Sequence, residues 1–100
     1  MLENIPKLLK VDKESQMEPH EFCAKWIKEI KPGEWGYFKA CVKELAEVTK
    51  LAPSTISKWG PDFSKRPDSV LVTLKKEDTL REVNVRLHEI QELLEQEKYK

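Results

Sequence analysis

The chain has 100 residues, which suits a single domain spanning residues 1–100. Its 18 Lys and Arg balance 18 Asp and Glu, and the resulting net charge of zero excludes a polybasic protein that holds nucleic acid by bulk charge alone. Only 3 Gly and 6 Pro exclude collagen-like and most low-complexity chains. Because no apolar run has the length of a membrane span or a signal peptide, we expect a cytoplasmic protein without a membrane segment.

The first third of the chain predicts one clear helix. Residues 1–14 carry only a weak pattern, compatible with a short helix along Leu2, Ile5, Leu8 and Leu9. A helix over residues 18–31 is predicted from the spacing of its apolar side chains, which are Phe22, Cys23, Trp26, Ile27 and Ile30. The pattern from Ser15 to Glu18 matches a capping box, and Pro32-Gly33 ends the helix.

Two more helical patterns follow. Over residues 34–49 an inward stripe steps by three and four, along Trp35, Phe38, Val42, Leu45 and Thr49. Gly36 weakens the first turn of this helix. Pro53 then begins a short helix that reaches Trp59, and Gly60-Pro61 closes it because proline cannot continue a helix.

The last third predicts an extended segment and a long helix. Residues 69–74 are apolar and β-branched, which favours a short strand or an extended segment packed on the helices. The longest helical pattern covers about residues 77–98, with Asp78 or Thr79 as its cap.

The two cysteines, Cys23 and Cys41, fall at apolar helical positions, so we expect two reduced thiols in the core. A zinc site that combines them with His20 and His88 is the alternative, but no second closely spaced pair accompanies His20 and Cys23. We therefore expect no metal ligands.

The segment from Val42 to Trp59 resembles a helix-turn-helix of the DNA-binding superfamily, as found in bacterial repressors, resolvases and transposon-associated regulators. In such a motif Ala46 lies where the second helix crosses the first, Leu45 and Thr49 face inward, and Leu51 fills the corner. Ile56 and Trp59 anchor the second helix in the core. The resemblance implies a mostly α fold: a tri-helical helix-turn-helix core with its motif at about 42–60, a short extended or β segment, and the long C-terminal helix.

Two positions depart from the family pattern. Members usually carry Gly in the turn where this chain has Lys50, and a positive φ at Lys50 costs roughly 1 kcal/mol. Members often place Ser or Thr at the cap of the second helix, where this chain has Ala52. Pro53 partly compensates because its ring fixes φ near the helical value.

By this resemblance the second helix enters the major groove of double-stranded DNA. Its outward residues, expected to read or approach base edges, are Pro53, Ser54, Thr55, Ser57 and Lys58. Four basic residues around it are expected to hold phosphates: Lys43, Lys50, Lys65 and Arg66. The alternative is that all of these are simply solvent-facing polar residues of a short helix.

The charges are not evenly spread along the chain. Residues 36–67 hold six basic and three acidic residues, an excess of three positive charges, while the flanking regions carry net charges of −1 and −2. The positive excess therefore falls on the motif and on the loop after it, where contacts with a DNA backbone are needed.

The C-terminal helical pattern contains a heptad-like seam of five apolar residues: Leu80, Val83, Leu87, Ile90 and Leu94. The seam either packs back on the helices of its own chain or pairs with a second copy. We favour a homodimer, because two recognition helices that read two half-sites bind DNA better than one.

The sequence thus predicts sequence-specific DNA binding by a small bacterial-type transcriptional regulator. Two alternatives stay open: an adaptor of the same fold that binds a protein and not DNA, and a DNA-binding accessory of a mobile element. The chain contains no GxGxxG, P-loop, HExxH or GxSxG motif, so we expect no catalytic residues and no cofactor.

Overall fold

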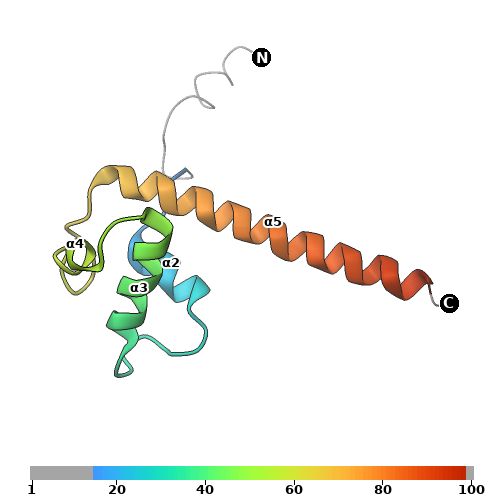
Figure 1. The fold of residues 1–100 in the computed structure, drawn as a ribbon, viewed down its shortest axis with the longest axis horizontal. Coiled ribbons are helices and arrows are strands. Elements are labelled where there is room, and N and C mark those ends of the chain that lie inside the picture. Colours follow the sequence, from blue (N-terminus) through green and yellow to red (C-terminus); the bar gives the residue numbers. More distant parts are fainter. Residues whose placement is uncertain (1–14, 99–100) are drawn as a thin grey trace, which may run out of the picture.

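The computed structural model describes residues 15–98, which form four helices. These are α2 (Pro19–Trp26), α3 (Tyr37–Thr49), α4 (Pro53–Ser57) and α5 (Asp68–Lys98). Residues 15–67, which we call the head, lie beneath the first part of α5, and the rest of α5 projects away from them (Figure 1). The predicted mostly α class with a long C-terminal helix is confirmed. The weak helical pattern over residues 1–14 lies outside the described residues.

The core lies between the three helices of the head and the first part of α5. Its buried side chains come from every helix, from the residue that follows α2 and from the α4–α5 loop. They are Phe22, Cys23, Ile27, Cys41, Val42, Leu45, Ile56, Trp59, Phe63, Val70 and Leu74. Both cysteines lie in this core as free thiols, as the sequence predicts.

Helix α2 is shorter than the predicted helix over residues 18–31. Its capping interaction lies one turn later than the sequence suggests, because the Glu18 N–H donates to Glu21 Oε1 at 3.1 Å. The helix ends at Trp26, and Ile27 takes an extended backbone with φ −92° and ψ 107°. Leaving the helix does not expose Ile27, which stays buried, and Ile30 still packs against the core. The apolar spacing thus identified the buried residues correctly but overestimated the helix length.

Helix α3 begins at Tyr37, after a glycine that turns the chain. Gly36 has a φ of 90°, a left-handed conformation that suits glycine. Trp35, which the predicted stripe places in the core, is instead 98% exposed on the outer side of this turn. Phe38 stacks on buried Phe63 with ring centroids 5.1 Å apart. The inward stripe therefore begins inside α3 and not at Trp35.

The predicted extended segment over residues 69–74 is wrong, because these residues form the first turns of α5. Val70, Leu71 and Leu74 are all buried, at spacings that place them on one side of a helix. Tertiary packing of this apolar side on α2 and α3 overrides the strand preference of a β-branched run. Helix α5 consequently begins at Asp68, nine residues before the predicted start, and neither Asp78 nor Thr79 caps it.

A buried carboxylate joins α2 to α5. Asp78 is only 2% exposed, and it accepts a hydrogen bond from Trp26 Nε1 at 2.9 Å. It also forms ion pairs with Lys25 Nζ at 2.7 Å and Lys75 Nζ at 3.5 Å. Burial alone would raise the pKa of Asp78, but the hydrogen bonds from Lys25 and Trp26 hold the pKa of this carboxyl below its ordinary value.

A second polar contact, one turn further along α5, joins that helix to α3. Arg81 donates to Glu44 of α3 at 2.5 Å and to Glu77 at 2.9 Å, and its guanidinium lies 4.9 Å from the centroid of the Phe22 ring. Beyond Arg81 every described side chain of α5 is exposed. Arg81 is therefore the last residue of α5 that is partly buried against the head.

We predict that Asp78→Asn lowers the free energy of unfolding by about 2 kcal/mol at neutral pH, because a hydrogen-bonded carboxylate in the core loses its charge. The pKa of Asp78 is lower in the folded state than in the unfolded state. The difference in free energy of unfolding between the native chain and the variant is therefore fully present above about pH 4, and it is lost as the pH falls through the folded-state pKa. Urea unfolding at several pH values measures this difference.

The matched control is Glu82→Gln, which changes the exposed partner of Lys25, 2.6 Å away. This variant is expected to cost less than about 0.5 kcal/mol. Equal losses in the two variants, or a difference that does not change with pH, would contradict the assigned role of Asp78.

Candidate functional site

A tight turn joins α3 to α4. Lys50 takes a left-handed conformation with φ 64° and ψ 22°, and its N–H donates to the carbonyl of Ala46 at 2.9 Å. The hydroxyl of Thr49 donates to the carbonyl of Leu45 at 2.7 Å and accepts from the N–H of Leu51 at 3.3 Å. The turn therefore adopts the positive φ that the sequence suggested, with lysine in place of glycine.

The two faces of α4 differ as the sequence predicts. Ile56 and Trp59 are buried, at 0% and 4% exposed, and they hold the segment against α3. The outward residues are all exposed: Pro53, Ser54, Thr55, Ser57 and Lys58. Leu51 is 38% exposed, so it covers the corner only in part. The outer side of α4 therefore presents short polar groups and one lysine to solvent, while the packing of Ile56 and Trp59 in the core holds the helix in place.

The regular part of α4 covers only five residues and ends at Ser57. Lys58 keeps nearly helical angles, and the Trp59 N–H donates to the carbonyl of Ile56 at 3.0 Å, so the coil continues as a turn. The Ser57 hydroxyl donates to the carbonyl of Pro53 at 3.1 Å. That hydroxyl proton is therefore used within the helix, which leaves Ser57 an acceptor towards any ligand.

The basic residues around α4 fall into two groups. Lys43, Lys50, Lys58 and Lys65 are exposed. Arg66 is different: its guanidinium pairs with Glu18 at 2.8 Å and with Asp68 at 3.2 Å. The hydrogen bond from Arg66 lowers the pKa of Glu18. Arg66 thus ties the α4–α5 loop to the start of α2. Within residues 15–98 it is the one expected phosphate ligand that already forms an ion pair.

Of the two acidic residues on α3, one is paired within the described part of the chain and one is not. Glu44 points to Arg81 on α5, whereas Glu47 is exposed, one helical turn from Lys43 along α3. When the internally paired Arg66 and Glu44 are set aside, residues 36–67 keep five exposed lysines against Glu47 and Asp62. The local excess of three positive charges is therefore still present on the folded surface.

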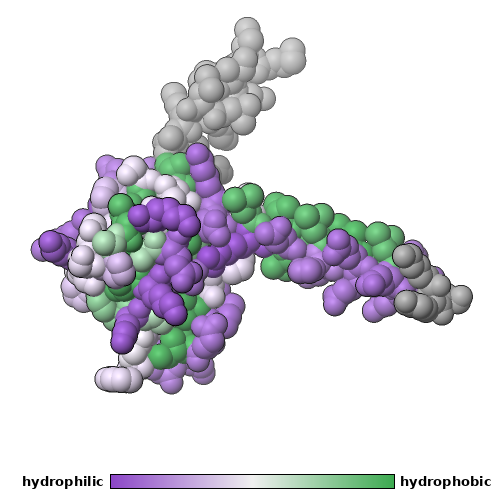
Figure 2. Space-filling model, viewed as in Figure 1, coloured by the Kyte–Doolittle hydropathy of each residue, from purple (hydrophilic) through white to green (hydrophobic). Residues whose placement is uncertain are grey.

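The outer half of α5 carries an exposed apolar surface. Figure 2 shows hydrophobic side chains in green along one side of the projecting helix, and hydrophilic ones in purple along the other. The five residues of the predicted seam are between 49% and 60% exposed, namely Leu80, Val83, Leu87, Ile90 and Leu94. Within residues 15–98 the seam does not pack on the chain's own helices, which was the alternative to a homodimer. Leu93, at 62% exposed, widens this surface and was missed because it precedes the seam residue Leu94.

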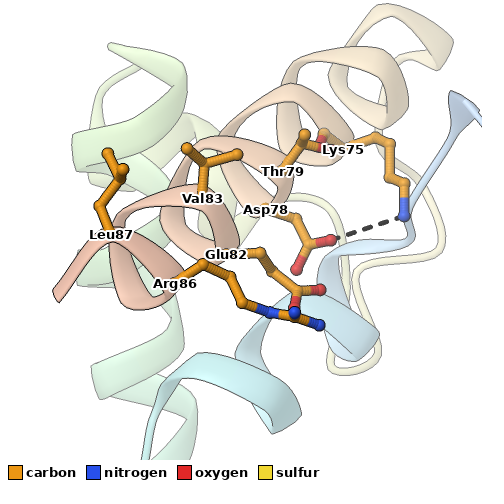
Figure 3. A pocket seen from close by; sticks show the side chains of 7 residues that line it. All are labelled: Lys75, Asp78, Thr79, Glu82, Val83, Arg86 and Leu87. Atoms are coloured by element: carbon orange, nitrogen blue, oxygen red, sulfur yellow. Dashed lines mark hydrogen bonds and ion pairs between the residues drawn. The ribbon is translucent and has the colours of Figure 1, made fainter. Parts of the chain in front are cut away.

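A shallow groove runs along α5 at the base of the projecting part (Figure 3). Val83 and Leu87 point to one side of it and Glu82 and Arg86 to the other, while Asp78 lies at its inner end, joined to Lys75 (Figure 3). All the residues that line it belong to this single helix. The groove is thus a feature of the helix surface, continuous with the seam.

The residues considered for zinc do not gather. Cys23 and Cys41 lie together in the core, where a hydrogen bond between the thiols and burial raise the pKa of Cys23. His20 and His88 are both exposed. Among residues 15–98, no group of three or more His, Cys, Asp or Glu side chains is arranged to hold a metal ion.

No helix in the same part of the chain is long and apolar enough to cross a membrane.

Comparisons of this chain with protein-family models, with curated proteins and with solved structures found no match.

The α3–α4 turn generates a prediction about stability. Lys50→Gly should raise the free energy of unfolding by about 1 kcal/mol, because glycine adopts a φ of 64° without the steric cost that a Cβ imposes. Lys50→Ala is the control, since it removes the same charge and keeps the Cβ, and it should leave stability nearly unchanged. Thermal unfolding of the three proteins measures the difference, and equal stabilities for the Gly and Ala variants would contradict the backbone argument.

Proposed function

We propose that this protein is a small transcriptional regulator that binds double-stranded DNA in the cytoplasm through α4, without a cofactor. The observation that carries the proposal is the two-sided construction of the segment from Pro53 to Trp59. Its inner side chains, Ile56 and Trp59, are buried, while its outer side offers Ser54, Thr55 and Lys58. A rigidly backed helix with short polar groups can approach base edges closely in a major groove that is ~12 Å wide.

The local charge supports the same partner. Phosphate contacts supply most of the affinity of a DNA-binding protein, and they need basic groups that are not already paired. Lys43, Lys50, Lys58 and Lys65 are exposed and form no ion pair within residues 15–98. In this proposal Lys58 reaches a base edge or a phosphate, the other three lysines hold phosphates, and Arg66 positions the loop that carries Lys65.

We also propose that the protein acts as a homodimer through the seam on α5. Five apolar side chains at heptad spacing are half exposed in the single chain, and water contact with such a surface is unfavourable. One recognition helix with an excess of three positive charges binds weakly, and a dimer doubles both the base contacts and the phosphate contacts.

A protein-binding adaptor is the second candidate, and one observation favours it. Trp35 is 98% exposed beside the turn at Gly36, and tryptophan is the side chain most enriched among the dominant contacts of protein interfaces. Glu47, exposed on α3 between Lys43 and the turn residue Lys50, also interrupts the positive surface. Binding that is abolished by Trp35→Ala and unaffected by Lys58→Ala would favour this candidate.

DNA binding is tested by fluorescence titration with a random pool of duplexes, followed by selection of the bound sequences. Lys58→Ala should weaken binding to the selected duplex about 10-fold and lower the slope of log affinity against log salt by about one. Lys28→Ala, an exposed lysine in the loop before α3, is the matched control and should change the affinity less than about twofold. No binding at low salt, or equal effects of the two variants, would contradict the proposal.

The homodimer is tested by sedimentation equilibrium. Leu87→Asp places a charge in the middle of the seam and should yield a monomer with an intact head, because Leu87 is exposed in the single chain and contributes nothing to the core. Val85→Asp is the control: Val85 is 48% exposed on the same part of α5 but lies outside the seam, so this variant should stay dimeric. A native chain that is monomeric at tens of micromolar would remove the dimer from the proposal and leave DNA binding to its own test.

A further inference from the structure

Helix α5 uses opposite sides for the core and for the seam. Nine residues correspond to two and a half turns of an α-helix, so side chains nine positions apart point in opposite directions. Leu71 and Leu74 of the core are thus opposite Leu80 and Val83 of the seam, and Asp78 is opposite Leu87. The seam therefore faces away from the head, and a second helix can lie along it without meeting the head of the same chain (Figure 2).

The seam ends in a basic residue on one side and an acidic residue on the other. Continuing the heptad spacing backward from Val83 leads to Lys76, and continuing it forward from Ile90 leads to Glu97. Both side chains are exposed, and neither takes part in an ion pair within the described residues. The apolar seam is thus bounded by opposite charges in line with it.

These two charges distinguish the two ways in which a pair of such helices can align. In a parallel pair each residue meets its own copy, so Lys76 would face Lys76 of the partner subunit and Glu97 would face the partner's Glu97. In an antiparallel pair Val83 meets the partner's Leu94 and Leu87 meets the partner's Ile90. Glu97 then lies against the partner's Leu80, one helical turn from the partner's Lys76, and the same contact repeats at the other end.

In a parallel pair, the residues that flank the seam do not offset the repulsion between the two copies of Lys76 and between the two copies of Glu97. Between residues 77 and 97 the positions that flank the seam are Glu77, Thr79, Asn84, Arg86, Gln91 and Leu93. Only two of them are charged: Arg86, and Glu77, which already pairs with Arg81 of its own helix. The outer half of α5 also carries Glu89, Glu92, Glu95 and Glu97, and a parallel pair would bring both sets together. An antiparallel pair leaves only the two copies of Glu89 level with each other and moves the copies of Glu92, Glu95 and Glu97 apart. It also sets the two helix dipoles in opposite directions.

We propose that a second copy of this chain covers the seam in antiparallel orientation, with Lys76 and Glu97 of the two chains paired at both ends and one head carried at each end of the paired helices. The proposal rests on the homodimer of the proposed function and specifies its geometry. It does not depend on whether the protein binds DNA.

Exchange of the two charges tests the orientation. At low salt, Glu97→Lys alone and Lys76→Glu alone should each raise the dimer dissociation constant about three- to tenfold, because two attractive contacts become repulsive. The double variant, Lys76→Glu with Glu97→Lys, should restore the native value. In a parallel pair every one of these proteins has like charges opposed, so equal dissociation constants for all four would overturn the proposal.

Cross-linking gives a second readout that does not depend on small differences in affinity. Mild oxidation of a mixture of Leu80→Cys and Glu97→Cys chains should produce the mixed disulfide, since the antiparallel pair places these positions opposite each other. The native cysteines are buried and do not compete. Val85→Cys, away from the seam, is the control that should not cross-link. A disulfide between two Glu97→Cys chains in preference to the mixed disulfide would overturn the antiparallel arrangement. A native chain that is monomeric at the same concentration would also overturn it. Neither result would change the outcome of the DNA titration, which tests DNA binding separately.

Discussion

The buried contact of Asp78 with α2 fixes the relation between the head and the long helix. A carboxylate that is 2% exposed needs partners for its oxygens, and Trp26 and Lys25 supply them from a helix distant in sequence. Together with the Arg81–Glu44 pair, this contact gives α5 one orientation against α2 and α3. The direction in which the outer half of α5 leaves the head is therefore set by polar contacts as well as by apolar packing.

Helix α5 thus has two different surfaces on opposite sides: one packs into the core and the other carries the seam. The first turns of α5 complete the core through Val70, Leu71 and Leu74, whereas the outer turns present a seam to solvent. Because the seam lies opposite the core side, any helix that covers it stays clear of α3 and α4. In the proposed regulator, pairing and DNA contact therefore occupy separate surfaces, and each can be altered by substitution without disturbing the other.

Local features were predictable from the sequence, and long-range ones were not. The positive φ of Lys50 and the buried anchors Ile56 and Trp59 agree with what the resemblance to a helix-turn-helix implies, and the seam spacing follows from periodicity. The helical state of residues 69–74 depends on α2 and α3, so the β-branched composition of that segment was misleading. The exposure of Trp35 depends on the turn at Gly36, which periodicity does not detect.

The distribution of charge also combines a local feature that the sequence predicts with long-range contacts that it does not predict. The count over residues 36–67 gave an excess of three positive charges from the sequence alone, but it could not show which charges are engaged. In the folded chain Arg66 pairs with Glu18, and Glu44 pairs with Arg81, so one residue of each sign is already engaged within the chain. The excess survives because these two losses cancel, and it now consists of lysines alone. A surface of flexible lysines suits sequence-independent contacts with phosphates, so in the proposed complex the discrimination between bases falls on Ser54, Thr55 and Lys58 of α4.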